Sequence, residues 1–354
     1  MLLKSEIYLR QIADALRNLG DCPGNLKQRS VLVTGAAGML GSCVTDMLIY
    51  LNEKQDLQIE IYAMGRTGRK LYERFGDYCG RHYFHVAESD LSREQKLKVP
   101  ADYVIHAASN ADPYMFANAP VDTLLANVIG VKNVLDLAGN HHAKRVLYVS
   151  SGEMYGQPDE AVADGFREDD CGAVNYGEAR SCYPAGKRAA EALCQSYIQQ
   201  YGLDVVIVRP CHCYGPTMTA TDSRALSQFF RNVLNGEDIV LKSSGETVRS
   251  HCYAIDAAAA MLKVLVDGKC GEAYNIADAA SVVSIREAAK LIAEAGGQAL
   301  RFELPDETDR RGFSKVTRAV LIAEKLRAMG WSPLFDMQKG VVETLKILSA
   351  GQKG

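Results

Sequence analysis

The chain has 354 residues, a formal net charge of −3 at pH 7 and 47% hydrophobic residues. This length is enough for one large α/β unit and a smaller lobe, while the nearly balanced charge gives no electrostatic footprint for nucleic acid or for an anionic membrane. No apolar run reaches the roughly 18 residues that span a bilayer.

The first segment, residues 1–28, has an amphipathic helix pattern in which acidic and basic residues are interspersed. It lacks the basic start and apolar core of a signal peptide. We therefore expect an N-terminal helical extension and a cytoplasmic protein.

A glycine-rich turn follows the first expected strand. Residues 31–33 read as a buried parallel strand, and Gly35, Gly38 and Gly41 come next at the spacing GxxGxxG, before an apolar helix pattern. Glycine allows a tight turn and lets the backbone approach a pyrophosphate, which then rests on the helix N-terminus. With a strand before it and a helix after it, the turn predicts a dinucleotide-binding site rather than an ordinary glycine-rich connection.

Strand and helix patterns then alternate along the chain. Further strands are expected at residues 59–64, 82–86, 103–106, 145–150 and 205–209. Such alternation predicts an α/β fold with a Rossmann-type doubly wound parallel sheet over residues 29–209. Ligands of such sheets bind in the crevice at the carboxyl ends of the strands.

Beyond residue 209 the pattern changes to polar loops and glycine turns. A helix is expected to begin at Ser284, with Glu287 as its capping-box partner. We expect residues 210–354 to form mainly a smaller C-terminal α/β lobe that binds substrate over the crevice, with some segments returning to the Rossmann domain.

The ten cysteines show no paired CxxC spacing with histidines nearby, so we expect reduced thiols. Cys211 and Cys213 flank His212, a pattern that can suggest a metal site. A CxC pair at the end of an apolar strand more often packs, and we expect no metal.

Tyr183 and Lys187 stand four residues apart in the segment RSCYPAGKR. On a helix such side chains project from one face, so the Lys187 ammonium is expected to lower the pKa of Tyr183 from about 10 toward working pH. A phenolate can then take the proton of a sugar hydroxyl while hydride leaves the same carbon for a nicotinamide. An isolated pair at this spacing is more often a plain side-chain contact, and it is the glycine turn upstream that favours chemistry.

Five motifs in order give the chain a family resemblance. They are VLVTGAAGMLGS, HAAS at 106–109, SSGEMYG at 150–156, YPAGK at 183–187 and RPCHCYGP at 209–216. Together they resemble the extended short-chain dehydrogenase/reductases, in particular the nucleotide-sugar epimerase/dehydratase group. The segments ASNADPYMFANAP, RSCYPAGKR, TDSRALSQF, TVRSHCYAID and DETDRR are most similar to the UDP-glucuronate decarboxylases of that group.

The resemblance implies roles for individual residues. It makes Ser151, Tyr183 and Lys187 the catalytic trio and implies a homodimer packed through the helix that carries Tyr183. The implied cofactor contacts are Tyr183 and Lys187 together with Gly35, Gly38, Met39, Leu40, Gly41, Arg66, Asp90, Leu91, Ala107, Ala108, Ser109 and Asn127. The implied contacts to a nucleotide-sugar substrate are Ser109, Tyr114, Arg224, Arg249 and Arg311.

The chemistry of a uronate fits two further residues. Oxidation of C4 turns the C6 carboxylate into a β-keto acid, and loss of CO2 leaves an enolate that is protonated at C5. Arg249 can hold the carboxylate or the enolate oxygen, or instead bind the diphosphate. Glu153 can relay a proton or order a water, or instead cap a loop.

Two positions depart from the family pattern. The dehydratases place an acid directly before the glutamate of SSGEMYG and the decarboxylases a serine, whereas this chain has Gly152. The second strand ends in Gly65 and Arg66, with no acid to accept hydrogen bonds from the adenosine ribose. We expect NAD as the cofactor, and NADP remains possible because Arg66 can pair with a 2′-phosphate.

These observations predict an enzyme that oxidises C4 of a nucleotide sugar with bound NAD. The leading hypothesis is decarboxylation of a UDP-linked hexuronate followed by reduction of C4. The alternatives are a C4 epimerase, a 4,6-dehydratase and a non-catalytic dinucleotide-binding scaffold.

Overall fold

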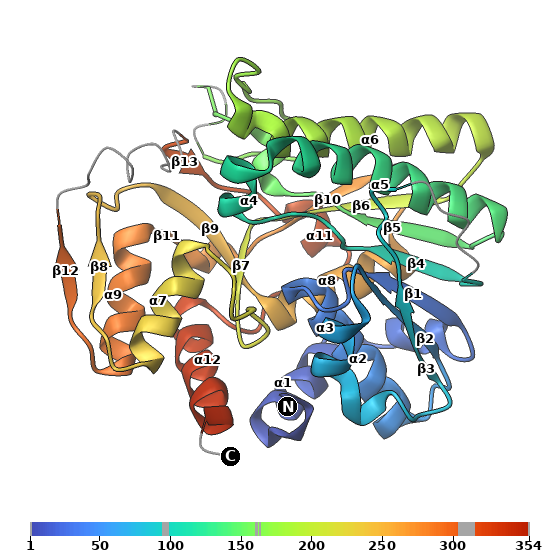
Figure 1. Ribbon diagram of the computed structural model, residues 1–354, viewed down its shortest axis with the longest axis horizontal. Coiled ribbons are helices and arrows are strands. Elements are labelled where there is room, and N and C mark those ends of the chain that lie inside the picture. The colour runs from blue at the N-terminus through green and yellow to red at the C-terminus, as the bar shows by residue number, and fades with distance from the viewer. Residues whose placement is uncertain (1, 94–98, 160–161, 163, 304–315, 353–354) are drawn as a thin grey trace.

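A seven-stranded parallel sheet forms the centre of the molecule (Figure 1). The computed structural model describes residues 2–93, 99–159, 162, 164–303 and 316–352. The strand order is β10-β6-β5-β4-β1-β2-β3, which confirms the predicted Rossmann-type fold. The strands of this sheet are β1 Ser30–Thr34, β2 Glu60–Gly65, β3 Phe84–Glu88, β4 Tyr103–His106, β5 Arg145–Val149, β6 Val205–Pro210 and β10 Ala273–Ile276.

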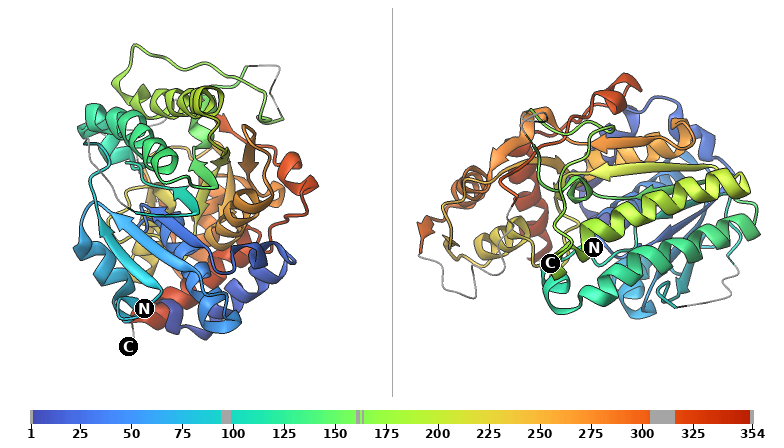
Figure 2. Two further views of the ribbon diagram at one scale, coloured as in Figure 1. Left: turned by 90° about the vertical axis from the view of Figure 1, so that its right-hand side faces the viewer. Right: turned by 90° about the horizontal axis from the view of Figure 1, so that it is seen from above.

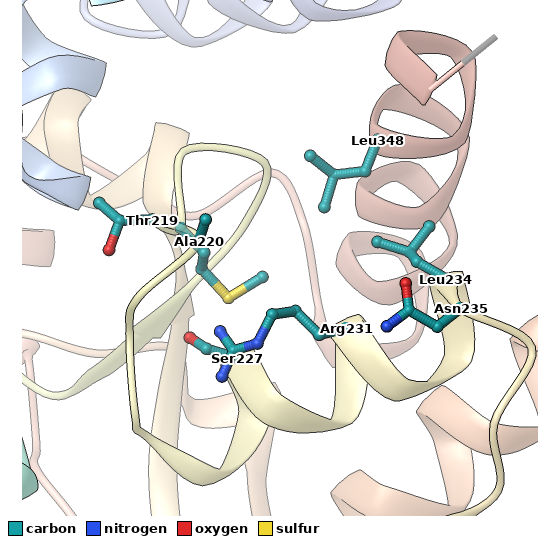
Figure 3. Close-up of a pocket in the computed structure, with 8 residues that line it drawn as sticks. Thr219, Ala220, Ser227, Arg231, Leu234, Asn235 and Leu348 are labelled. Atoms are coloured by element: carbon teal, nitrogen blue, oxygen red, sulfur yellow. The ribbon is translucent and has the colours of Figure 1, made fainter.

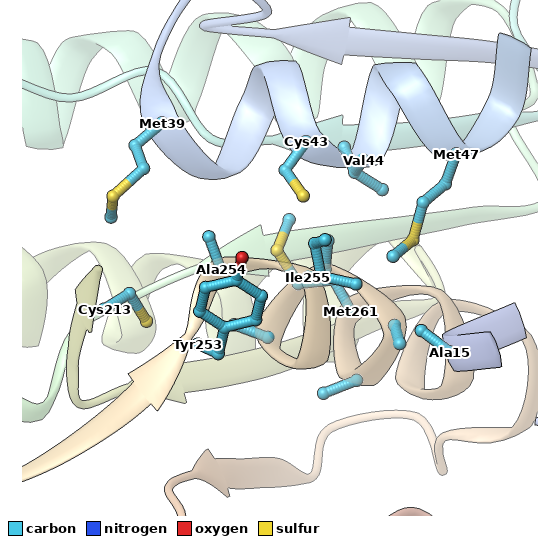
Figure 4. Packing of buried hydrophobic residues seen from close by; sticks show 14 of the residues in the cluster. Ala15, Met39, Cys43, Val44, Met47, Cys213, Tyr253, Ala254, Ile255 and Met261 are labelled. Carbon is cyan, nitrogen blue, oxygen red and sulfur yellow. The ribbon is translucent and has the colours of Figure 1, made fainter. Parts of the chain in front are cut away.

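Helices cover both faces of the sheet, which explains why its strands are continuous apolar runs (Figures 1 and 2). On one face α5 and α6 run side by side. On the other face α2 packs on α8, and Figure 4 shows Cys43, Val44 and Met47 of α2 facing Met261 of α8. The helices around the sheet are α1 Glu6–Arg17, α2 Met39–Gln55, α3 Gly68–Phe75, α4 Pro113–Asn118, α5 Pro120–Asn140, α6 Cys182–Tyr201, α8 Ala254–Asp267 and α11 Glu324–Ala328.

The N-terminal helix α1 is built into this packing. The Tyr8 hydroxyl is fully buried and donates to Asp46 of α2 at 2.7 Å, and Asp46 is also paired with Arg74. Burial raises the pKa of Asp46, and Arg74 opposes that effect. Gln11 donates to Glu343 at 2.9 Å. Helix α1 thus connects the Rossmann domain to the C-terminal helix of the smaller lobe.

In its described residues, the smaller lobe contains two short sheets and three helices (Figure 1). Ser284 and Glu287 form the predicted capping box at the start of α9. Two elements from beyond residue 209, β10 and α8, belong to the large sheet and its helical cover. The elements of the lobe are β7 His212–Tyr214, α7 Ala225–Leu234, β8 Ile239–Leu241, β9 Val248–Tyr253, β11 Val282–Ser284, α9 Ile285–Gly296, β12 Leu300–Phe302, β13 Arg318–Ala319 and α12 Met337–Gln352.

The crossovers change direction between β1 and β4. After β3 the chain crosses back and adds β4 on the other side of β1. The connections that follow β1 and β4 therefore lead to helices on opposite faces of the sheet. A crevice at the carboxyl ends of the strands is the usual result. Among the described residues, no helix combines the length and apolar character that a membrane crossing requires.

Candidate active site

The glycine turn lies at this change of direction. Gly35 has a φ of +68°, and a Cβ at this position would lie 2.7 Å from the backbone of Ala108, which follows β4. A Cβ on Gly41 would lie 2.1 Å from the Gly35 carbonyl oxygen. Gly38 is the N-cap of the long helix α2, and Met39 begins its first turn. Backbone amides at the N-terminus of α2, with no side chains in front of them, fit a dinucleotide pyrophosphate.

The connections after β2 and β3 bring other predicted cofactor residues together. Arg66 follows β2, and Asp90 and Leu91 follow β3, two strands that pair in register. The pKa of Asp90 is lowered, chiefly by the hydrogen bond from Ser92, and Arg66 is close enough to add to that effect. Leu91 is buried. This end of the crevice corresponds to the adenosine half of a dinucleotide.

The connection after β4 leads to the other end of the cofactor site. The Ala107 amide donates to the Thr34 carbonyl of β1 at 3.2 Å. The Ser109 hydroxyl donates to Asn127 of α5 at 3.0 Å. A Cβ at Gly186 would lie 3.0 Å from the Asn127 Cβ, so α6 approaches α5 closely here. We call this region, residues 35–41 and 107–109, the cofactor side of the crevice; it also contains Leu40.

The predicted trio lies next to the cofactor side. Ser151 follows β5 and is the N-cap of a short 3-10 helix, where its hydroxyl accepts from the Glu153 amide at 3.1 Å. Tyr183 and Lys187 lie on α6, as their spacing predicts. Tyr183 is buried, forms a hydrogen bond with Ser151 and stacks on Phe116 with ring centroids 4.5 Å apart. The structure therefore brings the three predicted catalytic residues together.

The pKa prediction for Tyr183 is wrong for this geometry. Burial raises the pKa of Tyr183, although the hydrogen bond with Ser151 opposes the rise. The Lys187 ammonium donates to the Val149 carbonyl at 2.8 Å and lies 5.7 Å from the Tyr183 ring centroid, so its charge is not placed on the phenol oxygen. Lys187 is only 2% exposed, and burial lowers its pKa to about 7.

A buried ion pair supports this part of α6. Glu191 of α6 accepts from Arg209 of β6 at 2.7 Å, and the Ser150 hydroxyl donates to Glu191 at 2.5 Å. Glu191 is also the nearest group that favours the charged form of Lys187. The pair fixes α6 against the ends of β5 and β6, from which Ser151 and the Arg209–Pro216 segment continue.

Arg249 of β9, in the smaller lobe, lies close enough to Glu153 for their charges to interact. It is 6% exposed, and its Nη2 donates to the Val316 carbonyl at 3.0 Å. Within the described part of the chain its Nη1 has no hydrogen-bond partner. Burial lowers the pKa of Arg249 to about 10, Glu153 opposes this effect, and Arg180 adds to it. Glu153 lies 3.6 Å from Arg180, so one carboxylate stands between two arginines.

Further basic side chains surround this point. Arg224 is held by Asp222 through hydrogen bonds of 2.9 and 3.0 Å, and its charge acts on Tyr183. Burial lowers the pKa of His212, and Arg249, Arg224 and Arg180 act in the same direction, which keeps the imidazole neutral. We call Glu153, Arg180, His212, Arg224 and Arg249 the substrate side of the crevice.

Sequence reasoning missed Arg180 and Phe116, and it considered His212 only as a possible metal ligand. Two signals were available, because RSCYPAGKR begins at Arg180 and His212 stands in RPCHCYGP. Tyr114 lies on α4 near Phe116, but its side chain is 64% exposed and takes no part in these contacts within the described residues. Arg311 lies outside the described residues.

Gly152 has a packing partner that the sequence does not reveal. A Cβ at Gly152 would lie 2.8 Å from Leu321 Cδ1 and 3.3 Å from the Pro210 carbonyl oxygen. Leu321 is buried and belongs to the small apolar cluster of Tyr155 and Phe166. An apolar side chain thus fills the space that a side chain at position 152 would need.

A separate cavity of about 320 Å³ lies between α7, α12 and the loop 217–220 (Figure 3). Arg231 and Leu348 contribute to its wall, and none of the predicted catalytic or cofactor residues does. Within the described residues, no group of three or more His, Cys, Asp or Glu side chains is arranged to hold a metal ion.

The parallel sheet, the glycine turn and the grouping of Ser151, Tyr183 and Lys187 fit the extended short-chain dehydrogenase/reductases that the sequence motifs resemble. Residues 31–277 match the model of the NAD dependent epimerase/dehydratase family. UDP-glucuronic acid decarboxylase 3 of Arabidopsis thaliana is 30% identical over 328 residues, which is 92% of this chain and 90% of that protein.

Solved structures show the same fold. UDP-glucose 4-epimerase of Thermotoga maritima superposes with a TM-score of 0.78 at 21% identity, over 91% of this chain and 99% of that one. The dTDP-glucose 4,6-dehydratase of Streptomyces venezuelae, solved with NAD, gives a TM-score of 0.77 at 23% identity, over 92% and 98%.

The chain belongs to the NAD dependent epimerase/dehydratase family. The prediction of an enzyme with NAD as its cofactor is thereby confirmed. The residues at the glycine turn, whose backbone leaves no room for a Cβ at Gly35 or Gly41, fit that cofactor.

Proposed function

We propose that this enzyme decarboxylates a UDP-linked hexuronate of the UDP-glucuronate type, with oxidation of sugar C4 before the loss of CO2 and reduction of C4 after it. The observation that carries the proposal is Arg249, a buried guanidinium whose Nη1 lacks a partner in the described part of the chain. A buried charge of this kind is costly unless an anion pairs with it. A carboxylate matches its forked donors, and the relatives named UDP-glucuronic acid decarboxylase support the same substrate class.

Tyr183 acts first in the proposed reaction. Its phenolate removes the proton from the C4 hydroxyl as C4 becomes a ketone. Bound NAD supplies a reversible hydride acceptor whose oxidised ring is positively charged, and a positive charge near the phenol favours the phenolate. Ser151 orients the phenol through their hydrogen bond, and Lys187, anchored on the Val149 carbonyl, holds its place on the same helix beside the cofactor side.

Arg249 and Glu153 act after the oxidation. The C6 carboxylate is then β to a ketone, so the C5–C6 bond breaks, CO2 leaves, and the electron pair remains as a C4–C5 enolate. Arg249 stabilises the negative oxygen. Glu153, or a water that it orients, delivers a proton to C5. Reduction of C4 and return of the Tyr183 proton to its oxygen complete the cycle.

The surroundings of Gly152 argue against dehydration. Expulsion of a C6 hydroxyl needs an acid, and this position offers neither an acid nor, because of Leu321, an empty space for a water in its place. The other basic residues of the substrate side, Arg180 and Arg224, suit the diphosphate of a nucleotide sugar.

The test is to incubate the purified protein with NAD and a panel of nucleotide sugars that includes UDP-glucuronate, UDP-glucose and UDP-galactose, and to weigh the products. Loss of about 44, 18 or 0 mass units separates decarboxylation, dehydration and epimerisation. The proposal expects a loss of about 44 from the uronate alone. Epimerisation of a neutral sugar without any decarboxylation would overturn it.

We further propose a homodimer and a cytoplasmic location. Helix α5, which packs on α6, exposes apolar side chains: Val121 is 66% exposed and Leu125 41%. Exposed apolar side chains grouped on one helix favour association between copies. All ten cysteines are free thiols, which suits a reducing compartment.

A further inference from the structure

The second strand lacks the acid that contacts the adenosine ribose in dinucleotide-binding folds, yet the structure places a carboxylate at that point. Gly65, the last residue of β2, is in register with Glu88, the last residue of β3. The Glu88 side chain crosses to the next turn, where its Oε2 accepts from the Gly68 amide at 2.6 Å. Gly68 is the first residue of α3. Glu88 therefore occupies the junction between β2 and α3.

This junction would otherwise attract anions. The N-terminus of α3 carries partial positive charge, and Arg66 lies two residues before it. A 2′-phosphate on the adenosine ribose, the group that distinguishes NADP from NAD, would bring about two negative charges to this end of β2. Glu88 fills the anion position itself: a Cβ on Gly68 would lie 2.9 Å from Glu88 Oε2.

A second carboxylate lies near the arginine. Asp90, two residues beyond Glu88, accepts from the Ser92 hydroxyl and pairs with Arg93 at 3.3 Å, and Arg66 adds the smallest of the effects that lower its pKa. Glu88 therefore occupies the helix N-terminus directly, and Asp90 adds negative charge to the surroundings of Arg66.

We infer that Glu88 selects NAD over NADP, and that this chain supplies its ribose-side acid from the third strand of the sheet instead of the second. A carboxylate can accept several hydrogen bonds, so the bond from Gly68 leaves capacity for the ribose 2′-hydroxyl of NAD. The same carboxylate repels the 2′-phosphate of NADP. The inference concerns the cofactor alone and does not depend on which sugar the enzyme modifies.

The test is a competition without substrate. Wild-type protein, Glu88→Gln and the double variant Glu88→Gln/Arg66→Ala are dialysed to equilibrium against equal concentrations of NAD and NADP, and the dinucleotides released on denaturation are quantified. Glutamine keeps the size and a carbonyl oxygen for the Gly68 amide but removes the charge. The matched control is Glu60→Gln, which alters a carboxylate at the opposite end of β2.

We expect wild type and Glu60→Gln to release mainly NAD, Glu88→Gln to raise the NADP to NAD ratio at least tenfold, and the added Arg66→Ala to remove most of that gain. A wild-type preference for NADP would contradict the inference. So would a ratio for Glu88→Gln within twofold of wild type, at an unchanged melting temperature. If Glu88→Gln instead lowers the melting temperature and leaves the ratio unchanged in the protein that stays folded, Glu88 is only a cap of α3 and the inference fails.

Discussion

The cofactor side and the substrate side of the crevice define their ligands by different means. On the cofactor side, the Gly35 backbone approaches Ala108 too closely for any added side chain. On the substrate side, Arg180, Arg224 and Arg249 outnumber the carboxylates Glu153 and Asp222 that contact or neighbour them. Close backbone packing thus characterises the cofactor side, whereas the excess of positive charge on the substrate side fits the anionic substrate that we propose. Tyr183 and Lys187 lie where the two sides meet.

The largest effect is expected from Tyr183→Phe, which removes the group shared by both sides. Loss of a general acid/base group typically lowers the rate by 10² to 10⁴. The phenylalanine ring keeps the stacking on Phe116, so affinities for NAD and for the nucleotide sugar should stay within about threefold of wild type. Steady-state kinetics and equilibrium binding measured on the same preparation check this. A rate within tenfold of wild type would remove Tyr183 from the proposed chemistry.

Arg249→Ala should impair a step that depends on the substrate side and leave the oxidation of C4 by the bound cofactor intact. A hydrogen bond to a charged group contributes about 1.5–3 kcal/mol, so turnover of the uronate should fall by roughly 10- to 150-fold. The first oxidation does not need Arg249, and reduced cofactor should therefore accumulate during a single turnover, visible by absorbance. Glu153→Gln should show the same pattern.

The control for this experiment is Arg231→Ala, because Arg231 lies in the same lobe but lines the separate cavity of Figure 3. It should turn over like wild type. If Arg249→Ala and Glu153→Gln raise only KM, both residues are binding groups. The C4 epimerase alternative would then be better supported than the decarboxylase.

The contact between Gly152 and Leu321 gives a smaller effect, on stability. Gly152→Ala places a methyl group against Leu321, and overpacking of this kind costs about 1–3 kcal/mol. In the background of Leu321→Ala, which itself costs about 2–5 kcal/mol, the same change should cost less, because only the contact with the Pro210 carbonyl oxygen then remains. Denaturant unfolding of the four proteins in this double-mutant cycle measures the coupling. Strictly additive free energies would show that the two residues do not compete for space.

A pH effect of roughly 2 kcal/mol between pH 7 and 9 is expected from Lys187. Its folded pKa of about 7 lies below the unfolded value of about 10.4, so between these pH values the unfolded chain binds the extra proton and stability rises with pH. Between pH 7 and 9 the free energy of unfolding of wild type should therefore rise relative to that of Lys187→Met. The difference between the two unfolding curves isolates this lysine from the other titrating groups. A difference that does not change with pH would mean that Lys187 is not desolvated as the structure indicates.

The sequence was sufficient where the pattern is local. The glycine spacing, six strands of the large sheet and the position of Tyr183 and Lys187 on one helix depend on neighbours within a few residues, and they were predicted, although the third strand is Phe84–Glu88 and not 82–86. The seventh strand, β10, was missed because it joins the sheet from beyond residue 209. The direction of the Tyr183 pKa shift was not predicted correctly. It depends on burial of the phenol and on the Val149 carbonyl, which accepts a hydrogen bond from the Lys187 ammonium. The role that we infer for Glu88 was equally hidden, since it depends on the register between β2 and β3.

The sequence motifs also did not predict that the basic residues of the substrate side lie close together. Arg180, just before α6, reaches Glu153 within the Rossmann domain. The packing of the smaller lobe on the sheet brings Arg249 of β9 to Glu153, and His212 of β7 to Arg249 and Arg180. The sequence shows that each of these residues is basic, but it does not show that they lie near one another in the fold.

Turnover of UDP-glucuronate in D2O with catalytic amounts of NAD tests whether the enzyme decarboxylates through a closed redox cycle. We predict a product about 44 mass units lighter apart from one deuterium, located on C5, because C5 takes its proton from solvent whereas the hydrogen removed from C4 returns to C4. Absorbance from reduced nicotinamide should not build up beyond the amount of enzyme. Deuterium at C4, or stoichiometric accumulation of reduced cofactor, would show an open redox reaction and contradict the proposed decarboxylation cycle.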